Sequence, residues 1–223
     1  MTRDKLLELY ATGCRKFPDA DLSHMDFTDC DLSGIDLRRA ILHRARFCNA
    51  NLSHADLRNV TGSGVDLQGA CLYGALLAYA NLPHATMDNA DLRYLDAFKA
   101  MLLDAHMRGA DLDTACFDAA WLLDAYFQGA NLKHANFSNA LLANSDLVWR
   151  AKSPSPAGHM MLAWTHTSVD TWIIHAGCRT FTLAEAREHW ARDAVRRDAL
   201  DPVVVYDWVQ PFLDFLDAET PSV

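Results

Sequence analysis

The sequence lacks long hydrophobic runs and paired cysteines. No stretch of 18 consecutive apolar residues occurs in the 223-residue chain, and its first residues do not read as a secretory signal peptide. A membrane-spanning helix needs about 20 predominantly apolar residues, so we expect neither a membrane span nor secretion. The six cysteines show no CxxC pair or other paired spacing, which favours a reducing cytoplasm over a disulfide-stabilised secreted domain.

The motifs of common enzyme classes are also missing. The sequence has no P-loop and no dinucleotide-binding glycine motif. The Cys and His residues that are close in sequence are His175, Cys178 and His189, and their spacing matches no zinc pattern. A catalytic thiolate needs a base and an oxyanion-stabilising loop, and neither can be named around Cys178. We therefore expect a non-enzyme without a cofactor or a metal ion.

Basic residues are scarce relative to acidic ones. The net charge is −9, and residues 20–149 contain 16 aspartates, no glutamate and only nine lysines and arginines. This balance argues against direct binding of nucleic acid, and it permits a basic protein partner.

What the sequence does contain is a five-residue repeat that runs without interruption over residues 20–149. The first unit is Ala20–His24 and the last is Ser145–Trp149. We call the third residue of each unit the centre. Centres fall at every fifth residue from Leu22 to Leu147, which makes 26 units, and Leu, Phe or Met occupies 24 of them. A fixed internal period predicts a solenoid, in which each unit buries its apolar positions only by stacking on its neighbours.

The pattern of these units, A(D/N)LXX, resembles the pentapeptide-repeat family. The resemblance covers residues 20–149 and implies an all-β solenoid, a right-handed quadrilateral β-helix with four units per coil. It also implies that the centre and the residue two before it point inward. The two small centres fit this frame, because Gly62 has Val60 as its inward neighbour and Ala97 has Leu95. The inward volume is thus roughly conserved, as a close-packed interior requires.

The segments on either side of the repeat are expected to form smaller elements. Residues 1–19 are predicted to be an N-terminal helical cap, because apolar residues recur at helical spacing over residues 3–12 behind the candidate N-cap Thr2. Such a cap would cover the apolar core and the strand edges that an open solenoid end exposes.

After the repeat we predict a linker over residues 150–158 and a small α+β C-terminal module over residues 159–223. The expected elements are strands at 160–167 and 171–174 with a turn at 168–170, and helices at about 182–194 and 201–216. The stretch 174–190 resembles a tail that follows the repeats in some phage and prophage proteins, and this resemblance implies no particular activity.

One side of the predicted rod carries an apolar stripe. Residues 20 apart stack on the same side when a coil has four units, and the stripe consists of Met101, Leu103, Trp121, Leu123 and Leu141. An apolar patch of this size is rarely left in water on a monomer. We expect residues 159–217 of the same chain to dock on it, and the alternative is a two-fold homodimer.

Two other surface features stand out. A smaller apolar spot on the adjacent side consists of Leu76, Ala78, Tyr79 and Phe98. Arginines gather in the first two coils: Arg38, Arg39, Arg44, Arg46 and Arg58.

Aspartates crowd the middle and later coils. Those that stand immediately before a centre are explained by the repeat, because a short polar side chain there can hydrogen-bond the backbone of the turn. The aspartates beyond that pattern form a candidate acidic partner-binding surface: Asp88, Asp104, Asp113, Asp118 and Asp124. The alternative is that these carboxylates also serve only the repeat.

Two functions remain open. In the first, a phage- or prophage-type protein uses its acidic rod to mimic duplex DNA and engages DNA gyrase or another DNA-binding protein, as the family resemblance implies for some members. Members that protect gyrase from quinolones carry loops that interrupt the coils, which this repeat lacks. In the second, the rod is a rigid adaptor that presents its C-terminal module or its apolar face to a host or viral protein.

Overall fold

The computed structural model describes residues 1–142, Ser145, four strands between residues 152 and 182, and residues 184, 185, 187 and 188. The chain divides into two compact units, Met1–Asp146 and Leu147–Val223. The first unit holds the repeat.

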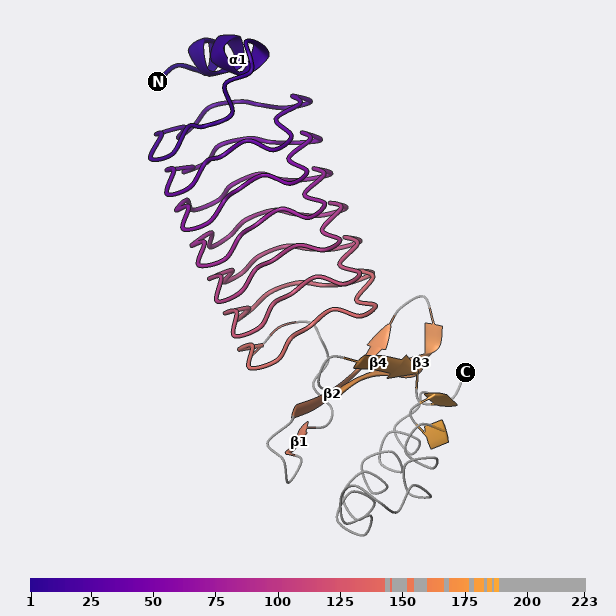
Figure 1. Cartoon of the computed structure of the whole chain (residues 1–223). Helices are drawn as coiled ribbons and strands as arrows, with labels where there is room; N and C mark the ends of the chain where they lie inside the picture. Colours follow the sequence, from indigo (N-terminus) through magenta and orange to yellow (C-terminus); the bar gives the residue numbers. More distant parts are fainter. Residues whose placement is uncertain are drawn as a thin grey trace, which may run out of the picture. The chain divides into compact units, whose positions relative to one another are not determined.

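Stacked coils with a period of 20 residues form the first unit (Figure 1). The residue before each centre makes a parallel β-bridge with the residue 20 positions later, in an unbroken series that ends at Trp121 and Leu141. The backbone bonds run both ways between coils: Ile41 N donates to Ala20 O at 2.9 Å, and Leu22 N donates to Ile41 O at 2.8 Å. Twenty residues are four units, so each coil has four sides, as expected.

The four sides are numbered by the units they contain. The first side contains residues 20–24 and every twentieth residue after them, the second 25–29, the third 30–34 and the fourth 35–39.

The interior of the coils contains the centres. Every centre from Leu22 to Leu142 is buried, the small centres Gly62 and Ala97 included. Aromatic centres stack on one another, with the rings of Phe27 and Phe47 5.1 Å apart and those of Phe117 and Phe137 5.2 Å apart. These burials confirm the predicted register for the described centres.

The position two residues before the centre is less completely buried at the N-terminal end of the coils. Cys30 and Met25 occupy this position in their units, and both are only half-buried.

Each corner of a coil is a tight turn with a left-handed residue. The fifth residue of every unit from Asp19 to Asn139 has a positive φ, between 52° and 73°. The turn is closed by a bond from the next unit, as in Ala45 N to Leu42 O at 3.0 Å. This is the pattern of a type II turn, whose third residue favours Gly or Asn.

Ala119 occupies such a corner with φ 56°. Asn tolerates the left-handed region better than Ala does, so Ala119→Asn should raise the free energy of unfolding by about 0.5–1 kcal/mol, a few degrees in Tm. The matched control is Ala119→Val, whose branched Cβ is poorly suited to positive φ and should lower the Tm. Thermal unfolding followed by circular dichroism measures both, and a lower Tm for both variants would contradict this assignment.

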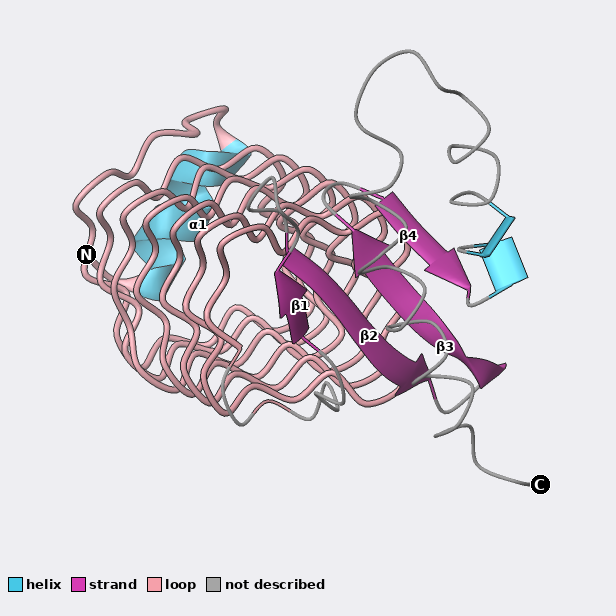
Figure 2. Cartoon of the chain, turned by 90° about the horizontal axis from the view of Figure 1, so that it is seen from below, coloured by secondary structure: helices cyan, strands magenta, loops and turns pink. Residues whose placement is uncertain are grey.

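The N-terminal helix α1 (Arg3–Ala11) packs against the first coils. Thr2 is its N-cap, and the Thr2 side chain accepts a hydrogen bond from Lys5 N at 3.3 Å. The Tyr10 hydroxyl donates to Ser33 O at 2.8 Å. Figure 2 shows α1 against the coils when they are viewed along the stack. The expected helix over residues 3–12 is therefore present.

The coils begin one unit earlier than predicted. Residues 1–19 were assigned to the helical segment, yet Lys16 forms a β-bridge with Asp36, and Phe17 is only 3% exposed. Phe17 acts as a centre although Arg15 replaces the usual small residue two positions before it. One large centre is enough to continue the stack.

In the second unit the structure describes an antiparallel sheet with the strand order β1-β2-β3-β4 (Figure 2). The strands are β1 (Lys152–Pro154), β2 (Met160–His166), β3 (Val169–Ala176) and β4 (Arg179–Thr182).

The sheet is larger than the sequence predicted. β2 matches its prediction, but β3 begins at Val169, inside the predicted turn. β1 lies inside the predicted linker, where Lys152 pairs with Leu162, and β4 was not expected. Partner strands thus override the linker-like composition, and Pro154 is tolerated because β1 is an edge strand.

The predicted helices are described only in small part. Residues 184, 185, 187 and 188 are helical. The rest of the helix predicted at 182–194, and all of the one at 201–216, lie outside the described residues and stay predictions.

Candidate interaction surfaces of the coils

The predicted apolar stripe lies on the first side. Met101, Trp121 and Leu141 form one column, joined by β-bridges between successive coils. Trp121 is 46% exposed and Leu141 is 47% exposed. Leu103 and Leu123 follow two residues after the first two members of this column, and they are half-buried. The structure therefore brings all five predicted residues together.

Backbone bonds hold the stripe in place. Trp121 N donates to Ala100 O at 2.8 Å, and Trp121 O accepts from Leu102 N at 2.8 Å. The column is thus tied to the coil before it, and a partner would meet a preformed surface rather than one that must order on binding. Whether residues 159–217 cover the stripe stays a prediction, because most of them lie outside the described residues.

The five candidate acidic residues are not on one side. Asp104 and Asp124 stack in one column of the first side, whereas Asp88 is on the second side, Asp113 on the third and Asp118 on the fourth. Aspartates that belong to the same or neighbouring coils lie on different sides, because each five-residue unit carries the chain around one corner. They do not form a single acidic surface.

Four of these five carboxylates have a partner on an adjacent coil. The pairs are Asp88 Oδ1 with Arg108 N at 2.7 Å, Asp104 Oδ2 with His84 Nδ1 at 2.8 Å, Asp113 Oδ1 with His134 Nδ1 at 2.9 Å, and Asp118 Oδ1 with Asn139 Nδ2 at 2.9 Å. Each therefore links successive coils, which favours the alternative that they serve the repeat.

Aspartates immediately before a centre bond the turn, as the repeat predicts. Asp21 Oδ1 accepts from Ser23 N at 3.0 Å, and Asp96 Oδ1 accepts from Phe98 N at 3.1 Å. The same contact recurs on the other sides and explains the consensus Asp or Asn at this position.

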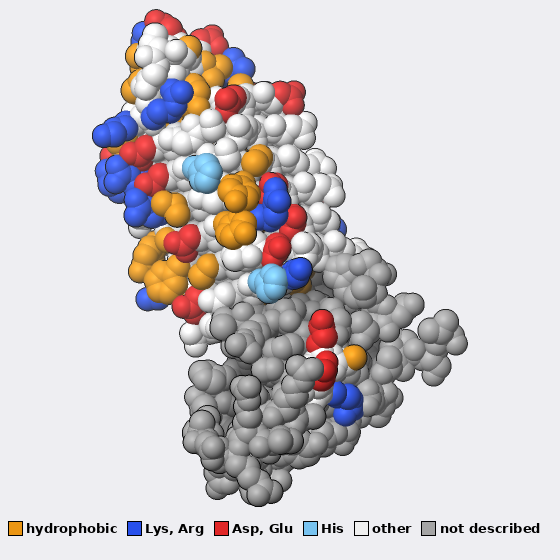
Figure 3. Space-filling model, turned by 45° about the vertical axis from the view of Figure 1, so that its right-hand side comes forward, with side chains coloured by type: hydrophobic (Ala, Val, Ile, Leu, Met, Phe, Trp, Pro, Cys, Tyr) orange, Lys and Arg blue, Asp and Glu red, His pale blue; other side chains and the backbone are white. Residues whose placement is uncertain are grey.

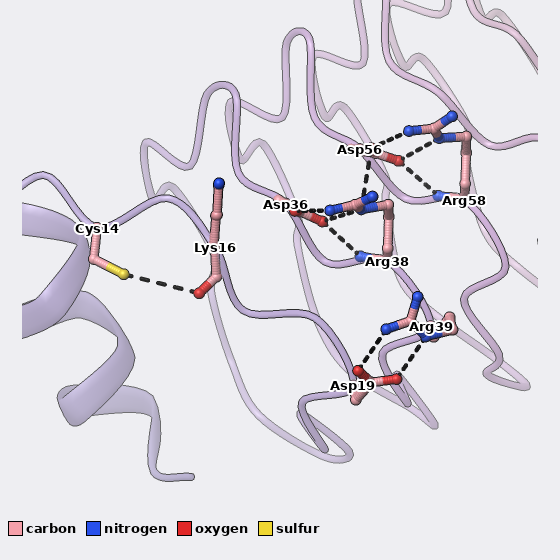
Figure 4. Close-up of polar contacts among 8 residues, drawn as sticks. All are labelled: Cys14, Lys16, Asp19, Asp36, Arg38, Arg39, Asp56 and Arg58. Atoms are coloured by element: carbon pink, nitrogen blue, oxygen red, sulfur yellow. Dashed lines mark hydrogen bonds and ion pairs between the residues drawn. The ribbon is translucent and has the colours of Figure 1, made fainter.

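The fourth side carries a ladder of arginines and aspartates in its first coils (Figure 4). Arg38 donates to Asp36 through Nε at 2.9 Å and Nη2 at 2.7 Å. Arg58 makes the same bidentate contact with Asp56, at 2.8 and 2.7 Å. Arg38 Nε also lies 3.5 Å from an oxygen of Asp56, so the pairs are joined across coils.

The hydrogen bonds from Arg38 and Arg58 lower the pKa of Asp36 and of Asp56 from the usual 3.8. Because these pKa values are lowered on folding, the pairs stabilise the coils above the unfolded pKa, and this contribution is lost as the pH falls through the folded value. The arginines are exposed, so the effect is small.

The smaller apolar spot lies farther along the fourth side. The rings of Tyr79 and Phe98 meet edge to face at 5.6 Å. Tyr79 is 51% exposed, and Lys99 Nζ lies 5.1 Å from the centre of the Phe98 ring. Figure 3 shows Lys and Arg side chains near the N-terminal end of one edge of the coils and apolar groups farther along it.

An aromatic group on the third side was missed by the sequence reasoning. Tyr94 is 55% exposed, and its ring lies 5.3 Å from that of Tyr73, which also contacts His54 at 5.6 Å. The 20-residue period could have predicted this group, because His54 and Tyr94 belong to one column and Tyr73 belongs to the column beside it. Each column read by itself shows only one or two aromatic residues.

The described part of the chain shows no cluster of metal-ligating side chains. It contains no group of three or more His, Cys, Asp or Glu side chains that could hold a metal ion. None of its helices is long and apolar enough to cross a membrane. His175 lies in β3, whereas Cys178 and His189 are outside the described residues, so their predicted non-catalytic role stays a prediction.

These features define a β-solenoid whose sides present columns of side chains. Residues 16–44, 40–77, 70–97 and 122–149 match the family described as pentapeptide repeats, in eight copies. Among solved structures, the chain is similar to alr5209, a pentapeptide repeat protein from Nostoc Pcc 7120, with 32% identity over 47% of this chain and 80% of that one and a TM-score of 0.27. The chain belongs to the pentapeptide repeat family, whose members fold as right-handed quadrilateral β-helices, and its own coils repeat every 20 residues with four sides.

Two further structures are similar. HetL, a pentapeptide repeat protein involved in heterocyst differentiation regulation from the cyanobacterium Nostoc sp. strain PCC 7120, is 23% identical, with 66% of this chain and 95% of that chain covered and a TM-score of 0.31. A trypsin-treated QnrB1, a plasmid-mediated fluoroquinolone resistance protein, is 21% identical, with 58% of this chain and 63% of that chain covered and a TM-score of 0.45. No curated protein matches the chain.

Proposed function

We propose that this protein is a non-catalytic adaptor that binds a host or viral protein through the apolar stripe on its first side. Pentapeptide repeat proteins are generally structural or interaction modules. The observation that carries the proposal is the near-half exposure of Trp121 and Leu141 in one backbone-bonded column. Exposed, contiguous apolar side chains of this kind mark protein-binding sites, and Trp is prominent among the residues that dominate binding energy.

A second candidate function is mimicry of duplex DNA toward DNA gyrase or another DNA-binding protein. The observation that favours it is the net charge of −9, which draws basic partners. The distribution of the carboxylates over four sides and their pairing with neighbouring coils give it less support than the stripe gives the adaptor.

One affinity-capture experiment separates the two functions. The full chain, a Trp121→Ser/Leu141→Ser variant and a variant with Asp104, Asp113, Asp118 and Asp124 each changed to Asn serve as baits for a bacterial lysate. The adaptor function predicts a protein that the wild type and the Asn variant capture, and that the Ser variant loses by at least tenfold. The matched control is Ile41→Ser, because Ile41 is 38% exposed in the same column but lies outside the stripe.

The opposite pattern supports the second function. Capture of gyrase subunits that is lost only in the Asn variant, together with inhibition of supercoiling by the wild type, would replace the adaptor by the DNA mimic. Equal capture by all four baits would show that neither surface is used.

A further inference from the structure

Three zones follow one another along the fourth side. The first contains Arg38, Arg39 and Arg58, each paired with an aspartate, the second contains the apolar spot of Leu76, Ala78, Tyr79 and Phe98, and the third contains Asp118. The β-bridges from Asp36 through Leu76 and Asp96 to Asn136 place these residues on successive coils of one side. The apolar zone therefore lies between the guanidinium of Arg58, which is paired with Asp56, and the carboxylate of Asp118.

This order is self-complementary. Arg58, Ala78, Phe98 and Asp118 form one column with a spacing of 20 residues. A two-fold axis perpendicular to this side, midway between Ala78 and Phe98, would reverse the column onto itself. It would place Ala78 opposite Phe98, and Arg58 opposite Asp118, which is the reciprocal pairing that an isologous interface requires.

The two charged groups can each accept a second partner. The Asp56 carboxylate accepts hydrogen bonds from Nε and Nη2 of Arg58. In the described part of the chain, no residue pairs with Nη1 of this guanidinium. Asp118 Oδ1 accepts a hydrogen bond from Asn139 Nδ2, and Asp118 Oδ2 can accept one from a further donor. A guanidinium has five donors and a carboxylate has about four acceptor positions, so an additional contact needs no rearrangement.

We propose that a second copy of this chain binds antiparallel along the fourth side, with Tyr79 and Phe98 at the centre and Arg58 of each copy paired with Asp118 of the partner subunit. The aromatic side chains at the centre supply the apolar contact. The charge pairs at the rim set the antiparallel direction, because a parallel arrangement would place like charges together. This contact leaves the apolar stripe on the first side available to another partner.

The size of the surface sets the expected affinity. Four coils at a spacing of about 4.8 Å span roughly 20 Å, and one side of a coil is narrow. The area is thus below the ~800 Å² per partner of a standard stable interface. We expect a weak, concentration-dependent dimer, with a Kd in the micromolar range or above.

Charge reversal in separate chains tests this geometry. Arg58→Glu and Asp118→Lys are made in the full chain and studied by sedimentation over a wide concentration range. Each variant alone should dimerise at least tenfold more weakly than the wild type, because like charges meet twice across the axis. An equimolar mixture should recover wild-type association, because in the mixed dimer the new acid at position 58 faces the new base at position 118 in one contact, and the native Asp118 faces the native Arg58 in the other.

The third side supplies matched controls. Arg93 is bidentate to Asp91, as Arg58 is to Asp56, so Arg93→Glu imposes the same local change away from the interface. Asp113→Lys is the control for the acidic position. Both should dimerise as the wild type does. Tyr79→Asn suits the positive φ of residue 79, 61°, and should weaken association even if Arg58→Glu fails to fold.

A wild type that stays monomeric at every concentration overturns the proposal. So does a mixture of the two reversed variants that associates no better than either variant alone.

Discussion

Replacing Leu112 by Asp should lower the free energy of unfolding by about 4 kcal/mol or more. Leu112 is a centre with 0% exposure, and its backbone is bonded to the next coil through Leu112 N and Asn131 O at 2.8 Å. An unpaired carboxylate at this position would lose its hydration without gaining a partner, which is among the few mechanisms that cause losses of this size. Chemical denaturation followed by circular dichroism measures the change.

The control adds the same charge to the same unit. Thr114 is exposed and has a φ of 63°, a conformation that Asp tolerates. Its hydroxyl donates to Asp113 Oδ1 at 3.1 Å, so Thr114→Asp loses one exposed hydrogen bond and should cost no more than about 1 kcal/mol. Equal stability of Leu112→Asp and Thr114→Asp would show that this centre does not face the interior.

Gly62→Leu should also destabilise the coils strongly, although Leu is the commonest residue at the centres. A Cβ at residue 62 would lie 2.8 Å from the carbonyl carbon of Leu42 and 3.0 Å from Cγ2 of Val65. The first of these neighbours is backbone, so the coil itself would have to move. We expect Gly62→Ala to cost about 1–3 kcal/mol, as overpacking does, and Gly62→Leu to cost more.

A double variant decides why Gly62 is needed. The sequence suggested that Val60 occupies the volume that the small centre leaves. If this exchange of volume were sufficient, Val60→Ala/Gly62→Leu would restore the family pattern and the stability. The contact with Leu42 predicts instead that the double variant remains less stable than the wild type. Thermal unfolding of the two variants beside the wild type measures this, and full recovery in the double variant would contradict the backbone explanation.

The register of the coils could be predicted because its cause is local. The five-residue period places a large and a small side chain inward in every unit, and only one frame buries both. The structure accordingly buries each described centre, and the aspartate before the centre bonds the turn as expected. The stripe was also predictable, since Met101, Trp121 and Leu141 follow from the period together with four units per coil.

Other features depended on contacts that a repeat pattern does not contain. Phe17 joins the stack because the next coil offers Asp36 as a bridge partner to Lys16, which outweighs the missing small residue at position 15. β1 forms in a stretch with linker-like composition because β2 supplies a pairing strand. The need for glycine at residue 62 arises from the approach of Leu42, 20 residues earlier in the chain.

The sequence by itself determined that this chain is a four-sided β-helix, which residues face inward, and that one side carries an apolar stripe. The inward positions follow from side-chain volume and polarity repeated at a fixed period, and the four sides and the stripe follow from that period together with the resemblance of the repeat to a known family. Only the tertiary structure decided which charged residues are already paired. It paired Asp88, Asp113 and Asp118 with residues of the next coil, the backbone of Arg108 and the side chains of His134 and Asn139. Pairing depends on the distance between atoms on neighbouring coils, and the order of residues along the chain does not contain that distance.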